Sequence, residues 1–245
     1  MKAKQIILLM AATTATYFTS CKKDSDSTTP MVTTPTFNIT STLENDTTYA
    51  AFTYNTNGNI NQVVNKEPSS DTSVYSVIYE PNLITVSISG IPFRTYFLNS
   101  KGNADSIVTD IEGFLTLITT NTYDNDGYLK SQNESVTFLG STTVTSRNYT
   151  YTNGNLTTMT ESDGTTNTVF TYDYFADKTN NISKVNLDNM FVGNSNKNLV
   201  KTEFTDGEIT TNYTYNFDSN GKVTKQIATG TNGEVSQTNY SWTCK

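Results

Sequence analysis

Aromatic side chains alternate with Thr, Asn and Ser along most of the chain. The clearest run covers residues 213–218, with the sequence Tyr-Thr-Tyr-Asn-Phe-Asp, and further runs occur at 52–54, 149–151, 170–174 and 240–244. Strict period-two alternation is typical of a strand with one face buried and the other in water. We therefore predict an all-β fold in which the aromatic residues face inward.

Short turn signals separate these runs. Asn-Gly and Asp-Gly pairs supply the positive φ angles that two-residue hairpin turns need, and strands joined by such turns are antiparallel neighbours. The chain should therefore form one large antiparallel meander, as a strongly curved open sheet or an incompletely closed barrel. Strand register stays open around Pro81 and at Lys101-Gly102, where the turn signal differs. The glycines of these pairs are Gly58, Gly127, Gly154, Gly164, Gly207, Gly221 and Gly233.

Residues 176–198 interrupt the alternation with an Asn-rich insertion. A long connection in a compact domain is usually functional or carries its own short helix. Large apolar side chains are costly in an exposed loop, so we expect the insertion to plug an end or the open face of the sheet, with a functional loop as the alternative. Its apolar residues are Ile182, Val185, Leu187, Met190 and Phe191.

The first residues have the form of an export signal. A basic start with Lys2 and Lys4 precedes an apolar and small-residue stretch at 6–18, which is too short to cross a bilayer. The sequence Phe-Thr-Ser leading into Cys21 resembles the bacterial lipobox, which implies that Cys21 is diacylated. We expect a signal peptide at 1–20, a flexible Ser/Thr/Pro tether at 21–36 and a single β domain at 37–245.

Two further resemblances extend this interpretation. Cys-Lys-Lys-Asp at residues 21–24 is similar to the start of surface lipoproteins of Bacteroidota, which implies outer-membrane anchoring with display at the cell surface; a periplasm-facing anchor is the alternative. The unit Tyr-Thr-Tyr-Thr-Asn-Gly-Asn-Leu at 149–156 is similar to YD repeats of the RHS class. Together with 196–199 and the aromatic end at 240–244, it makes the chain resemble uncharacterised Bacteroidota lipoproteins built from such hairpins. That resemblance implies a fold and a cellular location, and it implies no catalytic residues.

Composition excludes several functional classes. The chain has 23 acidic and 16 basic residues. The only charged residues in the signal peptide are lysines, so its removal makes the chain more acidic. An acidic chain of this kind binds polyanions poorly, so we expect no nucleic-acid partner. The absence of histidine excludes Ser-His-Asp and Cys-His nucleophiles and imidazole metal sites. With Cys21 acylated, Cys244 has no partner for an intramolecular disulfide. We expect no cofactor.

Two sets of carboxylates could still serve a two-acid glycoside hydrolase, the weakest of the functions considered. Both sets straddle turn-like sequence, where acids are ordinarily solvated. An EF-hand-like stretch from Asn216 lacks the closing acid, with Ile227 in its place, so we expect no calcium. The two sets are Asp105, Asp110 and Glu112, and Glu203, Asp206 and Glu208.

The aromatic runs admit two interpretations. Tyr213, Tyr215 and Trp242 could stack on sugar rings, as in a polysaccharide-binding accessory lipoprotein. A core role is favoured, because burial of the polar residues that alternate with the rings would leave their polar groups unsatisfied. Truncation of Phe217 should then lower the stability of the fold strongly. The predicted function is a non-enzymatic binding or structural module, held by membrane lipid through Cys21, with a glycan or another surface protein as its candidate partner.

Overall fold

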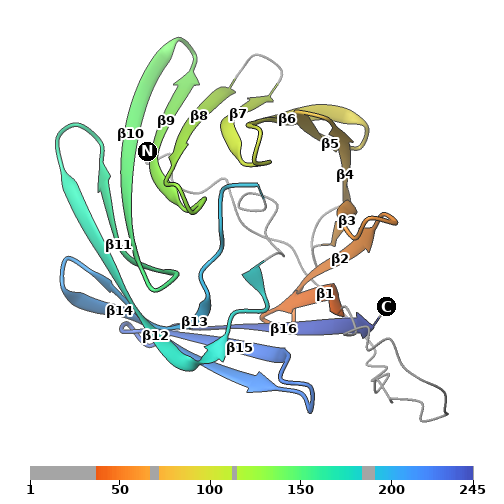
Figure 1. Cartoon of the computed structure of the whole chain (residues 1–245), viewed down its shortest axis with the longest axis vertical. Helices are drawn as coiled ribbons and strands as arrows, with labels where there is room; N and C mark the ends of the chain where they lie inside the picture. The colour runs from red at the N-terminus through yellow and green to blue at the C-terminus, as the bar shows by residue number, and fades with distance from the viewer. Residues whose placement is uncertain (1–36, 67–71, 112–114, 184–190, 245) are drawn as a thin grey trace.

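The computed structural model describes residues 37–66, 72–111, 115–183 and 191–244, which form sixteen antiparallel strands (Figure 1). The strands are β1 (Phe37–Glu44), β2 (Thr48–Tyr54), β3 (Ile60–Lys66), β4 (Ser73–Glu80), β5 (Leu83–Ile88), β6 (Ile91–Leu98), β7 (Ala104–Ile111), β8 (Leu115–Tyr123), β9 (Leu129–Phe138), β10 (Ser141–Thr152), β11 (Asn155–Ser162), β12 (Asn167–Thr179), β13 (Asn198–Thr205), β14 (Glu208–Phe217), β15 (Val223–Gly230) and β16 (Val235–Cys244). The signal peptide, the tether with Cys21, and Glu112 lie outside the described residues, as does the side chain of Cys244.

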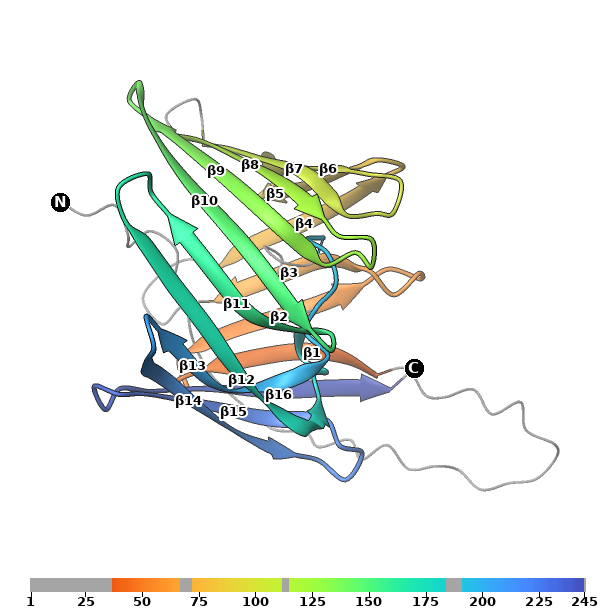
Figure 2. The same cartoon turned by 60° about the vertical axis from the view of Figure 1, so that its left-hand side comes forward.

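The strands form a closed barrel. Each strand pairs with the next along the chain, and β1 pairs with β16 through contacts such as Thr42 with Tyr240 and Glu44 with Thr238. The predicted all-β antiparallel meander is therefore confirmed. The open or incompletely closed sheet is not, because the first and last strands satisfy each other's backbone groups and leave no free edge. Figure 2 shows the wall of tilted strands from the side.

Turns of two kinds join the strands. Asn153-Gly154 and Asp206-Gly207 are two-residue turns with positive φ at both positions, as expected. The five-residue connections 55–59, 99–103, 124–128 and 218–222 differ from that expectation. Each begins with Asn or Asp and has glycine at positive φ in its fourth place.

The first residue of each five-residue connection organises the loop. Its side-chain Oδ1 accepts a hydrogen bond from the backbone N–H four residues on, as between Asp218 and Lys222 at 2.8 Å and between Asn99 and Asn103 at 3.1 Å. Lys101-Gly102 thus belongs to the same loop type as the Asn-Gly sites. The turn at Pro81 also keeps a regular register, since β4 and β5 pair without a shift from Glu80–Leu83 to Tyr75–Ile88.

Aromatic residues near the ends of even-numbered strands pin the open ends of the hairpins. Each donates a side-chain hydrogen bond to a backbone carbonyl near the start of the preceding strand. Tyr and Trp suit this position because an apolar ring carries one polar group. The pairs are Tyr54 to Ile39, Tyr79 to Ile60, Tyr123 to Ala104, Tyr174 to Leu156, Tyr215 to Val200 and Trp242 to Val223.

Alternation gives the wall an inner and an outer face. Buried residues such as Phe52, Val77 and Tyr96 define the inner face. The outer face carries mainly hydroxyl and amide side chains, several of which pair across strands: Thr122 with Ser131, Thr137 with Thr142, and Ser146 with Asn133. Some large apolar residues also face outward, for example Val144 and Ile118, the latter opposite Val108 on β7.

The described parts of the connection between β12 and β13 lie inside the ring of strands (Figure 1). Its described parts, 180–183 and 191–197, contain no α-helix, while Val185, Leu187 and Met190 lie outside the described residues. Ile182 and Phe191 pack against inward-facing residues of the wall. We refer to residues 180–183 and 191–197 as the plug, the role expected for the insertion.

A candidate binding site in the barrel lumen

A sixteen-stranded barrel is wider than its own wall side chains can fill, since eight strands already give a filled interior. The plug occupies part of this space, and it does so on one side. Two clusters of buried apolar residues from β1–β7 pack with Ile182, Phe191 and Val192 of the plug, and partly buried residues of β16 pack against one of them. We call these strands the apolar wall.

Phe191 anchors the plug to the apolar wall. Its ring meets Tyr96 edge-on at a centroid separation of 5.1 Å and Tyr79 at 6.0 Å, and its carbonyl accepts a 2.7 Å bond from the N–H of Ala104. Tyr96 itself is fully buried. The strands at this side therefore present a packed apolar surface to the plug.

A cavity of about 390 Å³ remains between the plug and the strands β9 and β10. No charged side chain lines it among the described residues; its walls are amides, hydroxyls and the rings of two tyrosines, with two aliphatic side chains. We call the inner face of β9–β14 the polar wall. The cavity is lined by Leu129, Gln132, Tyr149, Tyr151, Asn180, Ser183, Val192, Asn194, Ser195 and Asn196.

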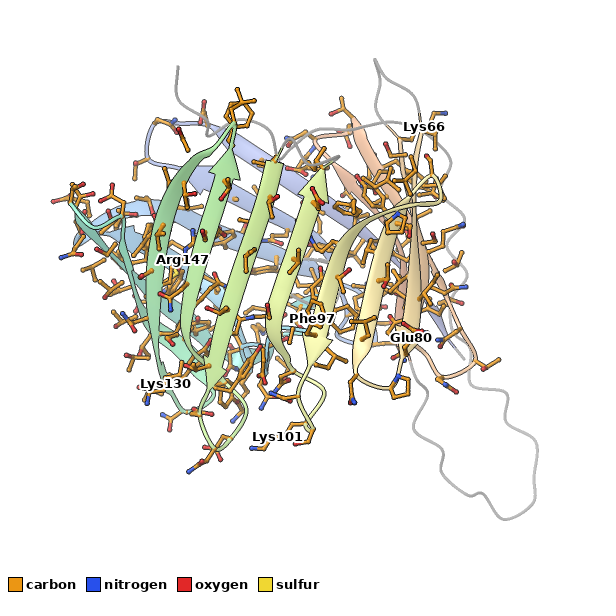
Figure 3. The ribbon with its side chains drawn as sticks, turned by 90° about the horizontal axis from the view of Figure 1, so that it is seen from above. Lys66, Glu80, Phe97, Lys101, Lys130 and Arg147 are labelled. Atoms are coloured by element: carbon orange, nitrogen blue, oxygen red, sulfur yellow. The ribbon has the colours of Figure 1, made fainter. Side chains whose placement is uncertain are left out.

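An ionic cluster lies beside the cavity on the polar wall. Arg147 donates from Nε to Glu161 at 2.7 Å, and from Nη1 to Gln132 at 3.0 Å and Glu134 at 3.4 Å. Burial acts to lower the pKa of Arg147, but the hydrogen bond to Glu161 and the charges of Glu134 and Glu161 outweigh it, so the pKa lies above its ordinary value. In Figure 3, Arg147 lies partway along the wall, between the rims marked by Lys66 and Lys101.

The cluster continues as a row of hydrogen bonds across five strands, from β11 to β7. Gln132 Oε1 also accepts a 3.4 Å bond from the Tyr149 hydroxyl, and Gln132 Nε2 donates to Asn121 at 3.1 Å. Asn121 in turn donates to the carbonyl of Ala104 at 2.8 Å. The N–H of Ala104 donates to the carbonyl of Phe191 in the plug. The row thus joins Arg147 to the residue on which the plug rests, and it fixes the side chain of Gln132.

Tyrosines and a glutamate extend the polar wall beyond the cavity. Burial raises the pKa of both Tyr149 and Tyr172 to about 12, so their hydroxyls remain protonated donors. Burial also raises the pKa of Glu203, although a hydrogen bond with Tyr213 opposes the shift. These residues form an aromatic and hydroxyl-bearing surface that faces the lumen.

Among the described members of the two predicted carboxylate sets, which exclude Glu112, no acid pair assembles. Asp105 is exposed and bonded to Asn99, and Asp110 is exposed on the outer face. Only Glu203 of the second set points inward, because Asp206 forms the following turn and accepts a bond from the Val169 N–H, and Glu208 is exposed. Asp218 of the calcium-like stretch is likewise used by its own turn.

The predicted stacking residues face inward without forming an exposed platform. Tyr213 and Tyr215 stack on one another at 6.5 Å on the polar wall, whereas Trp242 packs in the apolar wall. They are thus lumen-facing, partly buried residues. Phe217 differs from the core prediction: it is 36% exposed, because it is the last residue of β14, and its ring lies under Lys178 Nζ.

Sequence reasoning missed the residues of the ionic cluster. A signal was present, because Arg147 has the same strand parity as Tyr149 and Tyr151 and is one of only two arginines in the chain. A charged residue on an otherwise aromatic inner face needs a partner. The partners come from β9 and β11, and no local pattern identifies them.

Known structures share this fold. A crystal structure described as a porin-like protein from Bacteroides uniformis ATCC 8492 superposes with a TM-score of 0.64 at 19% identity, covering 84% of this chain and 96% of that one. Another porin-like protein, from Bacteroides vulgatus ATCC 8482, gives a TM-score of 0.61 at 12% identity, covering 83% and 97%. These identities show similarity of fold alone. No family model matches the chain, and no curated protein matches it. Among the described residues, no helix is long and apolar enough to span a membrane.

Proposed function

We propose that this protein is a non-enzymatic binding protein of the outer membrane, anchored through acylated Cys21, that captures its ligand in the barrel lumen. The observation that carries the proposal is the cavity between the plug and the polar wall. Its volume falls within the range of small-molecule sites, about 300–1,000 Å³, and its polar groups converge from both the wall and the plug.

The outer face of the barrel supports anchoring by lipid rather than by the wall. Membrane-embedded barrels carry an outward apolar band with aromatic girdles. Here Thr, Ser and Asn dominate the outer face and bridge neighbouring strands there. Such a wall is suited to water. An acyl anchor at Cys21, followed by the tether, would hold it at a membrane surface, and the porin-like folds from Bacteroides agree with an outer-membrane setting.

The ionic cluster supports binding over hydrolysis. A glycosidase needs two carboxyl groups that face one substrate bond across open space. Glu134 and Glu161 instead share the guanidinium of Arg147, and Glu203 faces tyrosines. Carboxylates held in this way shape and stiffen the wall.

Replacement of Cys21 by serine tests the anchor. We expect Cys21→Ser to move the protein from the outer-membrane fraction to the soluble fraction while its melting temperature stays unchanged. Protease treatment of intact cells tests surface display, because only an outward-facing barrel is cut. A mutant that still sediments with outer membranes would contradict the anchor, and a protease-resistant wild type would favour the periplasm-facing orientation.

A further inference from the structure

We infer that the lumen cavity is selective for a short, uncharged saccharide. This inference rests on the proposed lumen-binding function and names its ligand class. The cavity combines hydrogen-bonding amides and hydroxyls with tyrosine rings and has no ion of its own among the described residues. Hydroxyl-rich ligands with apolar ring faces match both parts of this lining.

The plug supplies two amide side chains, and one polar atom of each is already held by a hydrogen bond. Asn194 Nδ2 donates to the carbonyl of Asp126 at 2.7 Å, and Asn196 Oδ1 accepts from the N–H of Leu156 at 2.8 Å. These bonds orient both side chains and leave Asn194 Oδ1 and Asn196 Nδ2 without a hydrogen-bond partner among the described residues. One acceptor and one donor are thereby preorganised beside the cavity, and preorganisation lowers the entropy lost on binding.

The wall opposite supplies the second half of the site. Tyr149 and Tyr151 line the cavity together with Gln132, whose side chain is held by Arg147 and Asn121. An apolar ligand would leave these polar groups unpaired, which is costly in a partly buried site. A hydroxyl-bearing ring can instead satisfy them while it packs against the tyrosines.

The charge beside the cavity disfavours an acidic sugar. Arg147 is the cation of the cluster, and both Glu134 and Glu161 already bind it. The cluster therefore carries a net negative charge, so a ligand carboxylate would meet repulsion without a cation to pair with. Removal of the two glutamate charges should reverse this preference.

Isothermal titration with neutral disaccharides (maltose, cellobiose, xylobiose and mannobiose) and with digalacturonate tests the inference on the full-length chain. We expect at least one neutral disaccharide to bind and digalacturonate not to bind. Tyr149→Ala should weaken neutral binding at least about tenfold, whereas Asn148→Ala, on the outer face of the same strand, should leave it unchanged.

The charge argument has its own variant. Glu134→Gln combined with Glu161→Gln should create digalacturonate binding, at least about tenfold tighter than in the wild type, because Arg147 becomes available to a carboxylate. Circular dichroism verifies that each variant is folded. Binding of digalacturonate but of no neutral sugar by the wild type, with sensitivity to Tyr149→Ala, would overturn the ligand class and keep the lumen site. Binding of no probe, or binding indifferent to Tyr149→Ala, would overturn the lumen site itself.

Discussion

The apolar wall and the polar wall follow the same alternating pattern and yet have different interiors. On β16 and β1–β7, the inward positions hold Ile, Val, Phe and buried Tyr, which close around Phe191 and Ile182 of the plug. On β9–β14, the inward positions hold Tyr, Glu, Gln and Arg, and a cavity remains. Alternation thus determines which face turns inward, whereas the identity of the inward residues determines whether that face is packed or hydrated.

The plug is divided in the same way. Its apolar side chains contact the apolar wall, and Asn194, Ser195 and Asn196 line the cavity on the other side. An insertion with both kinds of residue can bury one surface and hydrate the other, so it fills only part of the lumen. The cavity is therefore a consequence of the plug's composition as much as of the width of the barrel.

The largest expected effect compares one tyrosine from each wall. Tyr96→Ala should lower the free energy of unfolding by about 3–5 kcal/mol, because Tyr96 is fully buried and supports Phe191. Tyr149→Ala should cost less than half as much, since its ring borders the cavity. Urea unfolding of the two variants measures the difference, and equal losses would mean that the two interiors are packed alike.

The turns allow a comparison that is independent of the walls. Gly221 has φ of +72° and no atom lies within 4 Å of the position of an added Cβ. Gly221→Val should therefore cost about 1–2 kcal/mol or somewhat more through backbone strain alone. Thr214→Ala, on the exposed face of β14, should change stability by less than about 0.5 kcal/mol. Matching melting temperatures would show that the turn at 218–222 tolerates side chains.

Phe217 tests where the inner face ends. Truncation to alanine should cost roughly 1 kcal/mol, because the ring is 36% exposed and its contacts are with Tyr215 and Lys178. A loss of about 3 kcal/mol or more, which a core position would give, would extend the packed interior to this rim. Thermal melting of Phe217→Ala and of Lys178→Ala, measured in parallel, separates the two effects. Lys178→Ala removes only the cation above the ring, whereas Phe217→Ala also removes the packing of the ring.

The smallest effect is a pH dependence from the polar wall. Burial raises the pKa of Glu203 above its ordinary value of 4.5, so the fold favours the protonated form. The stability that this preference contributes is present below the ordinary pKa and is lost as pH rises through the raised one. Glu203→Gln should therefore flatten the stability profile above the ordinary pKa of 4.5, measured by urea unfolding. An unchanged slope would mean that Glu203 is fully hydrated.

Local patterns predicted some elements well and others poorly. The strands around Tyr149 and Tyr213, and the inward direction of their rings, follow from alternation and turn residues. The half before residue 111 has weaker turn signals, yet its strands form the most tightly packed part of the wall. Packing there depends on Val77, Ile84 and Tyr96 meeting across three strands, and such contacts between strands are not visible in any one of them.

The site was the least predictable part. Gln132, Arg147 and Glu161 come from three strands, and their proximity follows from strand register. Closeness in sequence did not bring the described members of the carboxylate sets together. Asp105 and Asp110 are exposed on β7. Glu203 points inward, whereas Asp206 lies in the turn after it and Glu208 is exposed on the next strand.

The sequence by itself determined that the chain folds as antiparallel hairpins with aromatic residues on one face, because alternation and turn propensities act within a few residues. The tertiary structure alone decided that β1 meets β16 and that the insertion leans on one wall. It also decided that a cavity with neutral polar groups faces the other wall. These features depend on contacts between residues far apart in the chain, whose geometry is fixed only when the barrel closes.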